Sequence, residues 1–321
     1  MFLRRTSTIL SAVLLTASAT AGATAEATVS EGLLDRGVQA AIGAFGTLRG
    51  WATFGAGSVE AANAWKAFKA QDKDAFKKLE ELARQGNADA QNYMGHIYAA
   101  DADRANRDAN ANTAARWFAM AAQKGHPAAI YNLSLLQFAG RGVERDEARA
   151  MDAMATVKTQ IPSAALHLAL YHYKRKEFGI AWENAQFAAS RGEGMGAYIA
   201  GRMLHEGTAS GGQIDKVRRY LAEATKFYIS DAAWILATTY DEDKITPDSI
   251  MLSRAYRLIA VGIGKSGSMQ TPTILAGLST DEAKRAQNHA ENWFKRFKKP
   301  APRSYMATIP EVPAVTPSMI Y

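Results

Sequence analysis

The sequence predicts an all-α protein, a right-handed α/α solenoid of about five to six helix hairpins. The first observation is a phrase of the form Ala-x-x-Trp-x-x-x-Ala-Ala-x-x-Gly at 114–125, which recurs in altered form upstream and downstream. The second is its period of about 36 residues. The period is marked by one repeat position, which is filled in turn by Gly86, Gly125, Ile161, Gly192, Tyr228 and Gly264. Two apolar helical segments per unit of this length are typical of stacked hairpins, because no hairpin can bury its apolar face without a neighbour.

Residues 1–25 have the three-part layout of a secretory signal peptide. Arg4 and Arg5 precede an apolar run at 9–15, and small residues at 17–25 offer cleavage sites. The run is too short to cross a bilayer as a helix, since a span needs about 20 apolar residues. We therefore expect the mature protein to be exported and to reside in the periplasm. Because the chain has no cysteine, its stability must come from packing without disulfides.

The next segment, 26–59, is rich in glycine and is expected to be only partly helical. Apolar residues recur on one helical face at positions 34, 38, 42, 45 and 48. Each glycine within that pattern costs a helix about 1 kcal/mol relative to alanine. This segment is interpreted as a cap, an arm or a linker before the repeats.

Small and large residues alternate in the repeats in a way that favours close helix packing. Alanines three and four positions apart let paired helices approach, and large rings are expected to fill the space beside them. The rings in question are Tyr98, Trp117, Tyr220, Tyr240 and Tyr256. The glycine that ends each unit is expected to adopt the left-handed conformation that terminates a helix. Loops at 140–142 and 207–212 should join the two helices within a unit.

These phrases resemble the Sel-one-like repeat (SLR), a branch of the tetratricopeptide-like α/α solenoids. The resemblance is specific over 75–146 and extends in degenerate form over about 60–264. Ile161 and Tyr228 stand where the family has glycine, and Ala153 and Asn184 where it has tryptophan. The resemblance implies a non-enzymatic adaptor of envelope regulation, secretion or motility assemblies.

The C-terminal part is expected to close the solenoid, whose predicted extent is 60–297. Ser279 and Glu282 form the pattern of a capping box that opens a last helix over 279–297. From 298 to 321 the chain is rich in proline, which predicts an extended, mobile tail. That tail could itself be a ligand for another protein.

The positive charge is concentrated near this end. The formal net charge is +7, yet most of it comes from the signal peptide and from 284–303. A docking patch is therefore predicted, formed by Lys295, Arg296, Lys298, Lys299 and Arg303. Its partner would be an anionic membrane face or an acidic protein. A simpler interpretation is that cations at a helix C-terminus neutralise the helix dipole. Because the rest of the chain is nearly neutral, nucleic acid is not the predicted partner.

Sequence motifs give no support for catalysis, a cofactor or a metal. The Gly264-Lys265-Ser266 triplet lacks the earlier glycine and strand of a phosphate loop. The histidines are scattered over different units, so no zinc site is predicted. Clustered aspartates at 101–108 and 241–248 lack the glycine and glutamate of a calcium-binding loop.

The prediction from sequence is thus a non-enzymatic periplasmic scaffold that offers a concave surface to a protein or peptide of the cell envelope. The alternative is a cell-wall glycan or peptide binder, or an envelope enzyme that uses the same groove. Exposed aromatic residues beside two convergent carboxylates would favour that alternative, and aromatic residues buried between helices would favour the scaffold.

Overall fold

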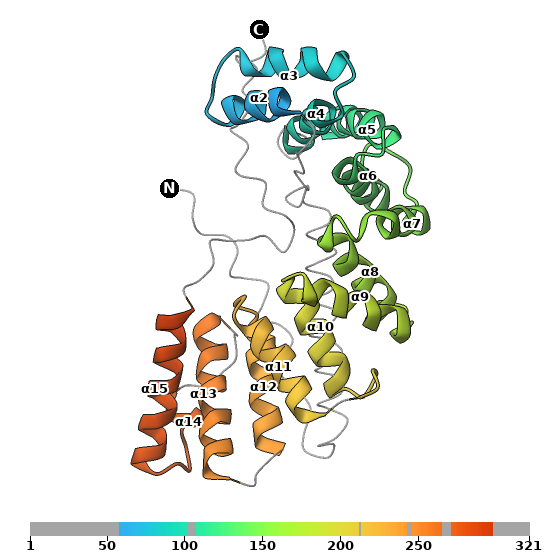
Figure 1. Ribbon diagram of the computed structural model, residues 1–321. Helices are drawn as coiled ribbons and strands as arrows, with labels where there is room; N and C mark the ends of the chain where they lie inside the picture. The colour runs from blue at the N-terminus through green and yellow to red at the C-terminus, as the bar shows by residue number, and fades with distance from the viewer. Residues whose placement is uncertain (1–57, 102–106, 212, 243–245, 265–270, 298–321) are drawn as a thin grey trace, which may run out of the picture. The chain divides into compact units, whose positions relative to one another are not determined.

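The computed structural model describes residues 58–101, 107–211, 213–242, 246–264 and 271–297 (Figure 1). The predicted signal peptide, nearly all of the Gly-rich segment and the Pro-rich tail lie outside these residues, and so do Lys298, Lys299 and Arg303. Every regular element in the described ranges is a helix. None of these helices is long and apolar enough to cross a membrane.

The helices follow one another with short connections. In chain order they are α2 (Val59–Lys69), α3 (Ala75–Arg84), α4 (Ala88–Asp101), α5 (Arg107–Gln123), α6 (Pro127–Ala139), α7 (Glu147–Val157), α8 (Pro162–Lys174), α9 (Phe178–Ser190), α10 (Gly194–His205), α11 (Ile214–Thr225), α12 (Ser230–Glu242), α13 (Pro247–Ile263), α14 (Thr271–Ile274) and α15 (Thr280–Arg296).

Consecutive helices pair into hairpins, and each hairpin packs on the next. The most extensive contacts join α4 with α5, α6 with α7, α8 with α9, α10 with α11, and α12 with α13. These are the pairs that the sequence places within one unit. Contacts of α5 with α6, α9 with α10 and α11 with α12 hold each unit to its neighbour. The predicted all-α solenoid is therefore confirmed.

The repeated glycine position behaves as predicted. Gly86, Gly125, Gly192 and Gly264 all have positive φ, between 75° and 118°, where side chains are disfavoured. Each lies just after the second helix of a hairpin, in the turn that leads into the next unit. Tyr228 occupies the same position and has a φ of 61° although it is not glycine. Such a conformation is uncommon outside glycine, asparagine and aspartate.

Small residues let the helices of a hairpin approach one another closely. Ala114 and Ala121 of α5 are fully buried. A Cβ added to Gly95 of α4 would lie 2.5 Å from the Phe118 ring of α5. Gly201 of α10 plays the same part against α11, since its added Cβ would lie 2.9 Å from Leu221 Cγ. Side chains larger than hydrogen would therefore push the helices of these hairpins apart.

The rings expected to fill space beside the alanines are partly buried, at 98, 117, 220, 240 and 256. Tyr98 and Trp117 pack against the N-terminal core, and Tyr256 packs against a C-terminal one. Large side chains that are fully buried include Phe118, Tyr131, Met154 and Leu221.

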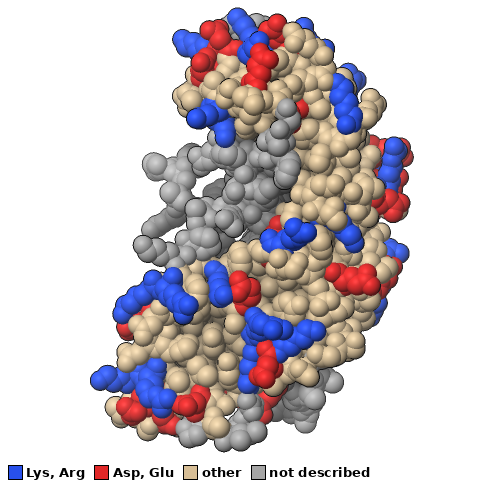
Figure 2. Space-filling view, viewed as in Figure 1, with Lys and Arg blue, Asp and Glu red and all other residues tan. Residues whose placement is uncertain are grey.

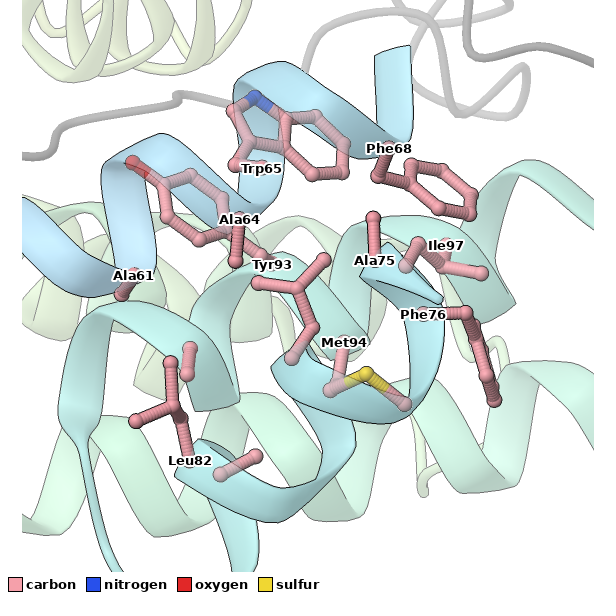
Figure 3. Close-up of a cluster of buried hydrophobic side chains, with 13 residues drawn as sticks. Ala61, Ala64, Trp65, Phe68, Ala75, Phe76, Leu82, Tyr93, Met94 and Ile97 are labelled. Atoms are coloured by element: carbon pink, nitrogen blue, oxygen red, sulfur yellow. The ribbon is translucent and has the colours of Figure 1, made fainter. Parts of the chain in front are cut away.

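The N-terminal core shows how the first described helices pack (Figure 3). The Trp65 ring of α2 stacks on Tyr93 of α4, with centroids 4.8 Å apart and planes 3° apart. Phe68 of α2 approaches Phe76 of α3 at 6.4 Å. Met94 is fully buried in the same cluster. Side chains from three helices thus meet in one apolar cluster.

Polar side chains bridge alternate helices along α4, α6, α8 and α10, and we call them the polar seam. Its members are Asn92, Asn132, Tyr131, His167, Tyr173, Tyr198, Arg202 and Glu206. Asn132 of α6 donates to Asn92 Oδ1 of α4 at 3.0 Å. Tyr131 of α6 stacks on His167 of α8, with centroids 5.5 Å apart. Tyr173 of α8 donates to Glu206 Oε2 at 2.6 Å.

The last members of the seam form an ion pair between the buried Arg202 and the more exposed Glu206. Arg202, 3 % exposed, donates to Glu206 Oε1 at 2.5 Å and to Tyr198 Oη at 3.2 Å. Burial and the hydrogen bond to Glu206 raise the pKa of Tyr173. Its hydroxyl therefore stays protonated and keeps donating. Each unit is thus tied to the next by polar contacts as well as by apolar packing.

The C-terminal helix closes the stack as the sequence predicts. Ser279 accepts a hydrogen bond from the Glu282 N–H, and Glu282 accepts one from the Ser279 N–H, so the capping box is confirmed. An added Cβ on Gly262 of α13 would lie 2.6 Å from the Phe294 ring of α15. Tyr228 Oη donates to the Phe297 carbonyl at 2.6 Å. The turn after α11 is thereby joined to the end of α15.

Gly142→Ala is expected to destabilise the protein more than Gly125→Ala. Both residues have positive φ, so both variants carry backbone strain of roughly 1–2 kcal/mol. The new methyl at 125 meets nothing within 4 Å, whereas at 142 it overlaps the Ala111 backbone of α5. Overpacking adds roughly 1–3 kcal/mol. Urea unfolding followed by circular dichroism measures the difference, and equal losses for the two variants would contradict the close approach.

The buried His167 is expected to make stability fall with decreasing pH. Burial lowers the pKa of His167 to about 3, whereas an unfolded histidine titrates near 6.5. Below that value the unfolded state gains a proton that the folded state does not take up, so folding weakens by roughly 2 kcal/mol between pH 7 and pH 5. Replacing His167 with Phe should remove this part of the pH dependence, and replacing the partly exposed His205 with Gln should not. Unfolding at both pH values tests this.

Candidate interaction surface

Partly exposed rings on the C-terminal units form two contacting pairs, which we together call the aromatic strip. It consists of Trp182 of α9, Tyr220 of α11, Tyr240 of α12 and Tyr256 of α13. Trp182 meets Tyr220 edge-on at 6.2 Å, and Gln186 Nε2 lies 3.4 Å from Tyr220 Oη. Tyr240 stacks on Tyr256, with centroids 5.8 Å apart and planes 2° apart. Trp182 and Tyr220 therefore bridge successive hairpins, whereas Tyr240 and Tyr256 join the two helices of one hairpin.

Cations cover the faces of these rings. Lys216 Nζ lies 5.1 Å above Trp182, and the Arg218 guanidinium lies 4.0 Å above Tyr240. Arg218 also donates to the Thr239 carbonyl at 2.6 Å, which holds it beside α12. Such contacts fix the rings and place positive charge along the strip. On the face shown in Figure 2, Lys and Arg gather over the C-terminal helices, with Asp and Glu between them.

An arginine cluster joins α12 to α13. It consists of Asp241, Ser253, Arg254 and Arg257. Asp241 accepts hydrogen bonds from Ser253 at 2.6 Å and from Arg257, and Arg254 Nη1 lies 3.7 Å from Asp241 Oδ1. The Arg257 guanidinium lies 4.8 Å above the Trp234 ring. Burial alone would raise the pKa of Asp241, but the hydrogen bonds and the arginine charges outweigh it and lower that pKa. Asp241 is therefore ionised.

The predicted docking patch is only partly described. Lys295 and Arg296 are exposed in the last turn of α15. Lys295 lies 3.9 Å from Glu291. Arg296 lies 5.4 Å above the Phe297 ring, and Lys226 of α11 approaches the same ring at 5.8 Å. The patch thus gains a cation from α11 that sequence reasoning did not include.

The described residues give little support for other candidate sites. No group of three or more His or acidic side chains is placed there to hold a metal ion. A depression of about 340 Å³ lies against α3, but the side chains that line it, from Lys77 to Gln85, belong to that one helix. Two of them, Arg84 and Glu80, pair with each other at 2.8 Å. The helix α13 ends at Gly264 with φ 118°, as expected for a repeat turn.

Sequence reasoning named Tyr220, Tyr240 and Tyr256 but missed Trp182 and Arg254. A signal was present, because Trp182, Arg218 and Arg254 share one repeat position at intervals of 36 residues. That position lies two residues before the one occupied by Trp117, Tyr220 and Tyr256. Sequence analysis followed only the family's tryptophan position, where α9 carries Asn184. It therefore missed Trp182, which lies two residues before that position.

Comparisons with known proteins address the fold. A scan against protein-family models finds no match. A search of curated proteins also finds no significant relative. Several solved structures are similar, and two are described. One is a protective antigen present in uropathogenic Escherichia coli strains and displaying an SLR fold, with a TM-score of 0.61, 16 % identity, and coverage of 74 % of this chain and 53 % of that one. The other is a Sel1 repeat protein from Oxalobacter formigenes, with a TM-score of 0.57, 18 % identity, and coverage of 73 % and 97 %.

The chain therefore has the SLR fold, as its repeats predict. It spans about half the length of the antigen and nearly all of the Oxalobacter protein. At these identities the likeness concerns the fold.

Asp241→Asn is expected to destabilise the protein at pH 7 by roughly 1–3 kcal/mol, because it leaves two partly buried arginines without their counter-ion. The folded pKa of Asp241 is lowered, so its stabilisation is present above the unfolded pKa near 3.9 and is lost as pH falls through the folded value. The difference from wild type should therefore shrink in acid. Thermal unfolding at pH 7 and pH 3 measures it.

The matched control is Asp248→Asn, which breaks the exposed pair with Arg285. Exposed pairs contribute about 0–1 kcal/mol, so this variant should unfold close to wild type at both pH values. An equal effect at 241 and 248 would count against the arginine cluster as a buried electrostatic unit.

Proposed function

We propose that this protein is a non-enzymatic scaffold that binds a protein or peptide partner on the aromatic strip. The observation that carries the proposal is the strip itself: two pairs of partly exposed rings, Trp182 with Tyr220 and Tyr240 with Tyr256, each with a cation over one of its rings. Solenoids of this kind present extended surfaces assembled from equivalent positions of successive units.

The chemistry of the strip suits protein recognition. Tyr and Trp supply large apolar area with few rotatable bonds, and with Arg they are the residues enriched in binding hot spots. The strip combines these types in one place. Because the rings are already held by Lys216 and Arg218, a partner would lose little side-chain entropy on ordering them.

A glycan-binding or enzymatic role would need two convergent carboxylates beside the exposed rings. Asp241, which directly follows Tyr240 in α12, is tied to Ser253 and Arg257. A single ionised carboxylate between arginines has no proton to donate and is a weak base. The arrangement favours binding over general acid–base chemistry.

We propose further that the protein works in the periplasm after cleavage of residues 1–25, within an envelope assembly for regulation, secretion or motility. The support is the signal-peptide layout of the sequence. The docking patch at Lys295, Arg296, Lys298, Lys299 and Arg303 would add peripheral contact with an anionic membrane face.

Removing rings from the strip is expected to abolish partner capture. The processed full-length protein carries Trp182→Ala and Tyr220→Ala together and is crosslinked in its own envelope, and mass spectrometry compares the captured proteins with those of wild type. We expect at least a tenfold loss of the reproducible set, because hot-spot rings carry most of the binding energy.

The control is Phe187→Ala, since Phe187 is a half-buried ring of α9 outside the strip whose face is covered by Arg191. It should capture the same set as wild type. Circular dichroism must show all three proteins folded. Unchanged capture by the double variant, or no reproducible partner for wild type, would refute the proposal.

A further inference from the structure

The last described residue, Phe297, lies beside the end of α11. Its carbonyl accepts a hydrogen bond from Tyr228 Oη at 2.6 Å. Lys226, in the same turn after α11, places its Nζ 5.8 Å from the Phe297 ring. Tyr220 of the aromatic strip lies six residues before Lys226, which is about 9 Å along a helix axis. The segment that follows Phe297 therefore starts less than two turns of helix away from Tyr220.

The Pro-rich tail at 298–321 is long enough to reach the pair formed by Trp182 and Tyr220. Pro310 lies thirteen residues after Phe297. In polyproline II conformation each residue advances the chain by about 3.1 Å, which gives roughly 40 Å in all. Because the tail is tethered beside the strip, its effective concentration there is on the order of millimolar. Even weak docking would therefore be well populated.

The tail has the sequence pattern of a polyproline II ligand. Pro310 and Pro313 form a Pro-x-x-Pro motif, and Pro317 follows. Glu311 is the one charged residue within 304–321, so this part of the tail is acidic whereas the stretch before it is basic. Such segments dock on surfaces lined by aromatic side chains, because their preformed helix loses little conformational entropy on binding.

Trp182 and Tyr220 have the chemistry that such a motif requires. Both rings are partly exposed, and with their planes at 76° and centroids 6.2 Å apart they form a corner against which a proline ring can pack. Gln186 Nε2 lies 3.4 Å from Tyr220 Oη. A polyproline II backbone makes no internal hydrogen bonds, so its carbonyls can accept one from such a side chain. Lys216, over Trp182, makes no ion pair with any described residue and suits a carboxylate.

We infer that the Pro-x-x-Pro motif of this chain's own tail docks on Trp182 and Tyr220. Glu311, inside the motif, then pairs with Lys216. The second pair of the strip is a poorer seat, because its ring planes are 2° apart and leave no corner. This inference rests on the proposed function and adds a regulation of the same surface, since a partner must displace the tail.

The test measures where the tail lies in the processed full-length protein. Because the chain has no cysteine, nitroxide labels can be attached at Ser190→Cys, at the exposed end of α9, and at Ser318→Cys, just beyond the motif. Double electron–electron resonance gives the distribution of distances between the labels. We expect a narrow component at short distance, because a docked tail holds its label near α9. A broad distribution without that component would overturn the inference.

Variants of the tail test the motif. Pro310→Ala/Pro313→Ala should lower the narrow component roughly threefold or more, because the motif loses the rings that pack on the corner. Pro300→Ala/Pro302→Ala is the matched control, since it removes two prolines of the same tail outside the motif. It should leave the component at the wild-type level. Equal effects of the two variants would contradict docking through the motif.

Variants of the strip test the other side of the contact. Trp182→Ala/Tyr220→Ala should lower the narrow component as much as loss of the motif does, and Phe187→Ala should not. Lys216→Gln and Glu311→Gln should each lower it, and both together no further than one alone, as expected for an ion pair. Additive losses would contradict the pairing. A short distance between two singly labelled chains would overturn the inference in favour of a second copy.

The outcomes separate this inference from the proposed function. If Trp182→Ala/Tyr220→Ala loses its captured partners but wild type shows no narrow component, the scaffold stands and the docked tail is refuted. If that variant captures everything that wild type captures, the proposed function fails whatever the distances show. Pro310→Ala/Pro313→Ala should raise capture roughly threefold or more, because the tail no longer competes with the partner. Unchanged capture would contradict the competition. Thermal unfolding confirms that the proteins compared are folded.

Discussion

The close approach of neighbouring helices at alanine and glycine is the contact on which the rest of this structure depends. Ala114 and Ala121 of α5 are fully buried, and Gly95 of α4 lies against the Phe118 ring. Large rings fit against these small residues, as Phe118 does against Gly95. The rings at 182, 220, 240 and 256 are less deeply buried and stay partly exposed along the stack.

Polar groups in the stack fall into two kinds. Some side chains of the polar seam are paired across units, as Asn132 is with Asn92 and Tyr173 with Glu206. Paired in this way, they favour one register between hairpins, because a shifted register would leave buried donors unmet. Other polar atoms are buried without a hydrogen-bond partner among the described residues, as are Tyr131 Oη of the seam and the Nε atoms of Arg254 and Arg257, and these add nothing to register.

Sequence was sufficient wherever the determinant is local. The turn glycines follow from conformational preference, and the capping box at Ser279 and Glu282 follows from the spacing of two residues. What sequence could not give depends on which helix edge meets which neighbour. The period located Tyr220 and Tyr256 but not their exposure, and it passed over Trp182 because α9 presents its ring two positions earlier. The arginine cluster forms only once α12 and α13 bring Arg254 and Arg257 close to Asp241.

Tyr228 has a consequence for how this array can evolve. Its backbone adopts a conformation that glycine would adopt without strain, and its hydroxyl reaches the carbonyl of Phe297, sixty-nine residues further on. That reach spans one unit and the closing helix and no more. A duplication inserted between them would carry the terminal helix out of range while the strained tyrosine remained. Growth of the array by gain of a repeat is thus disfavoured at this end, where the tyrosine fixes the length of the chain that follows it.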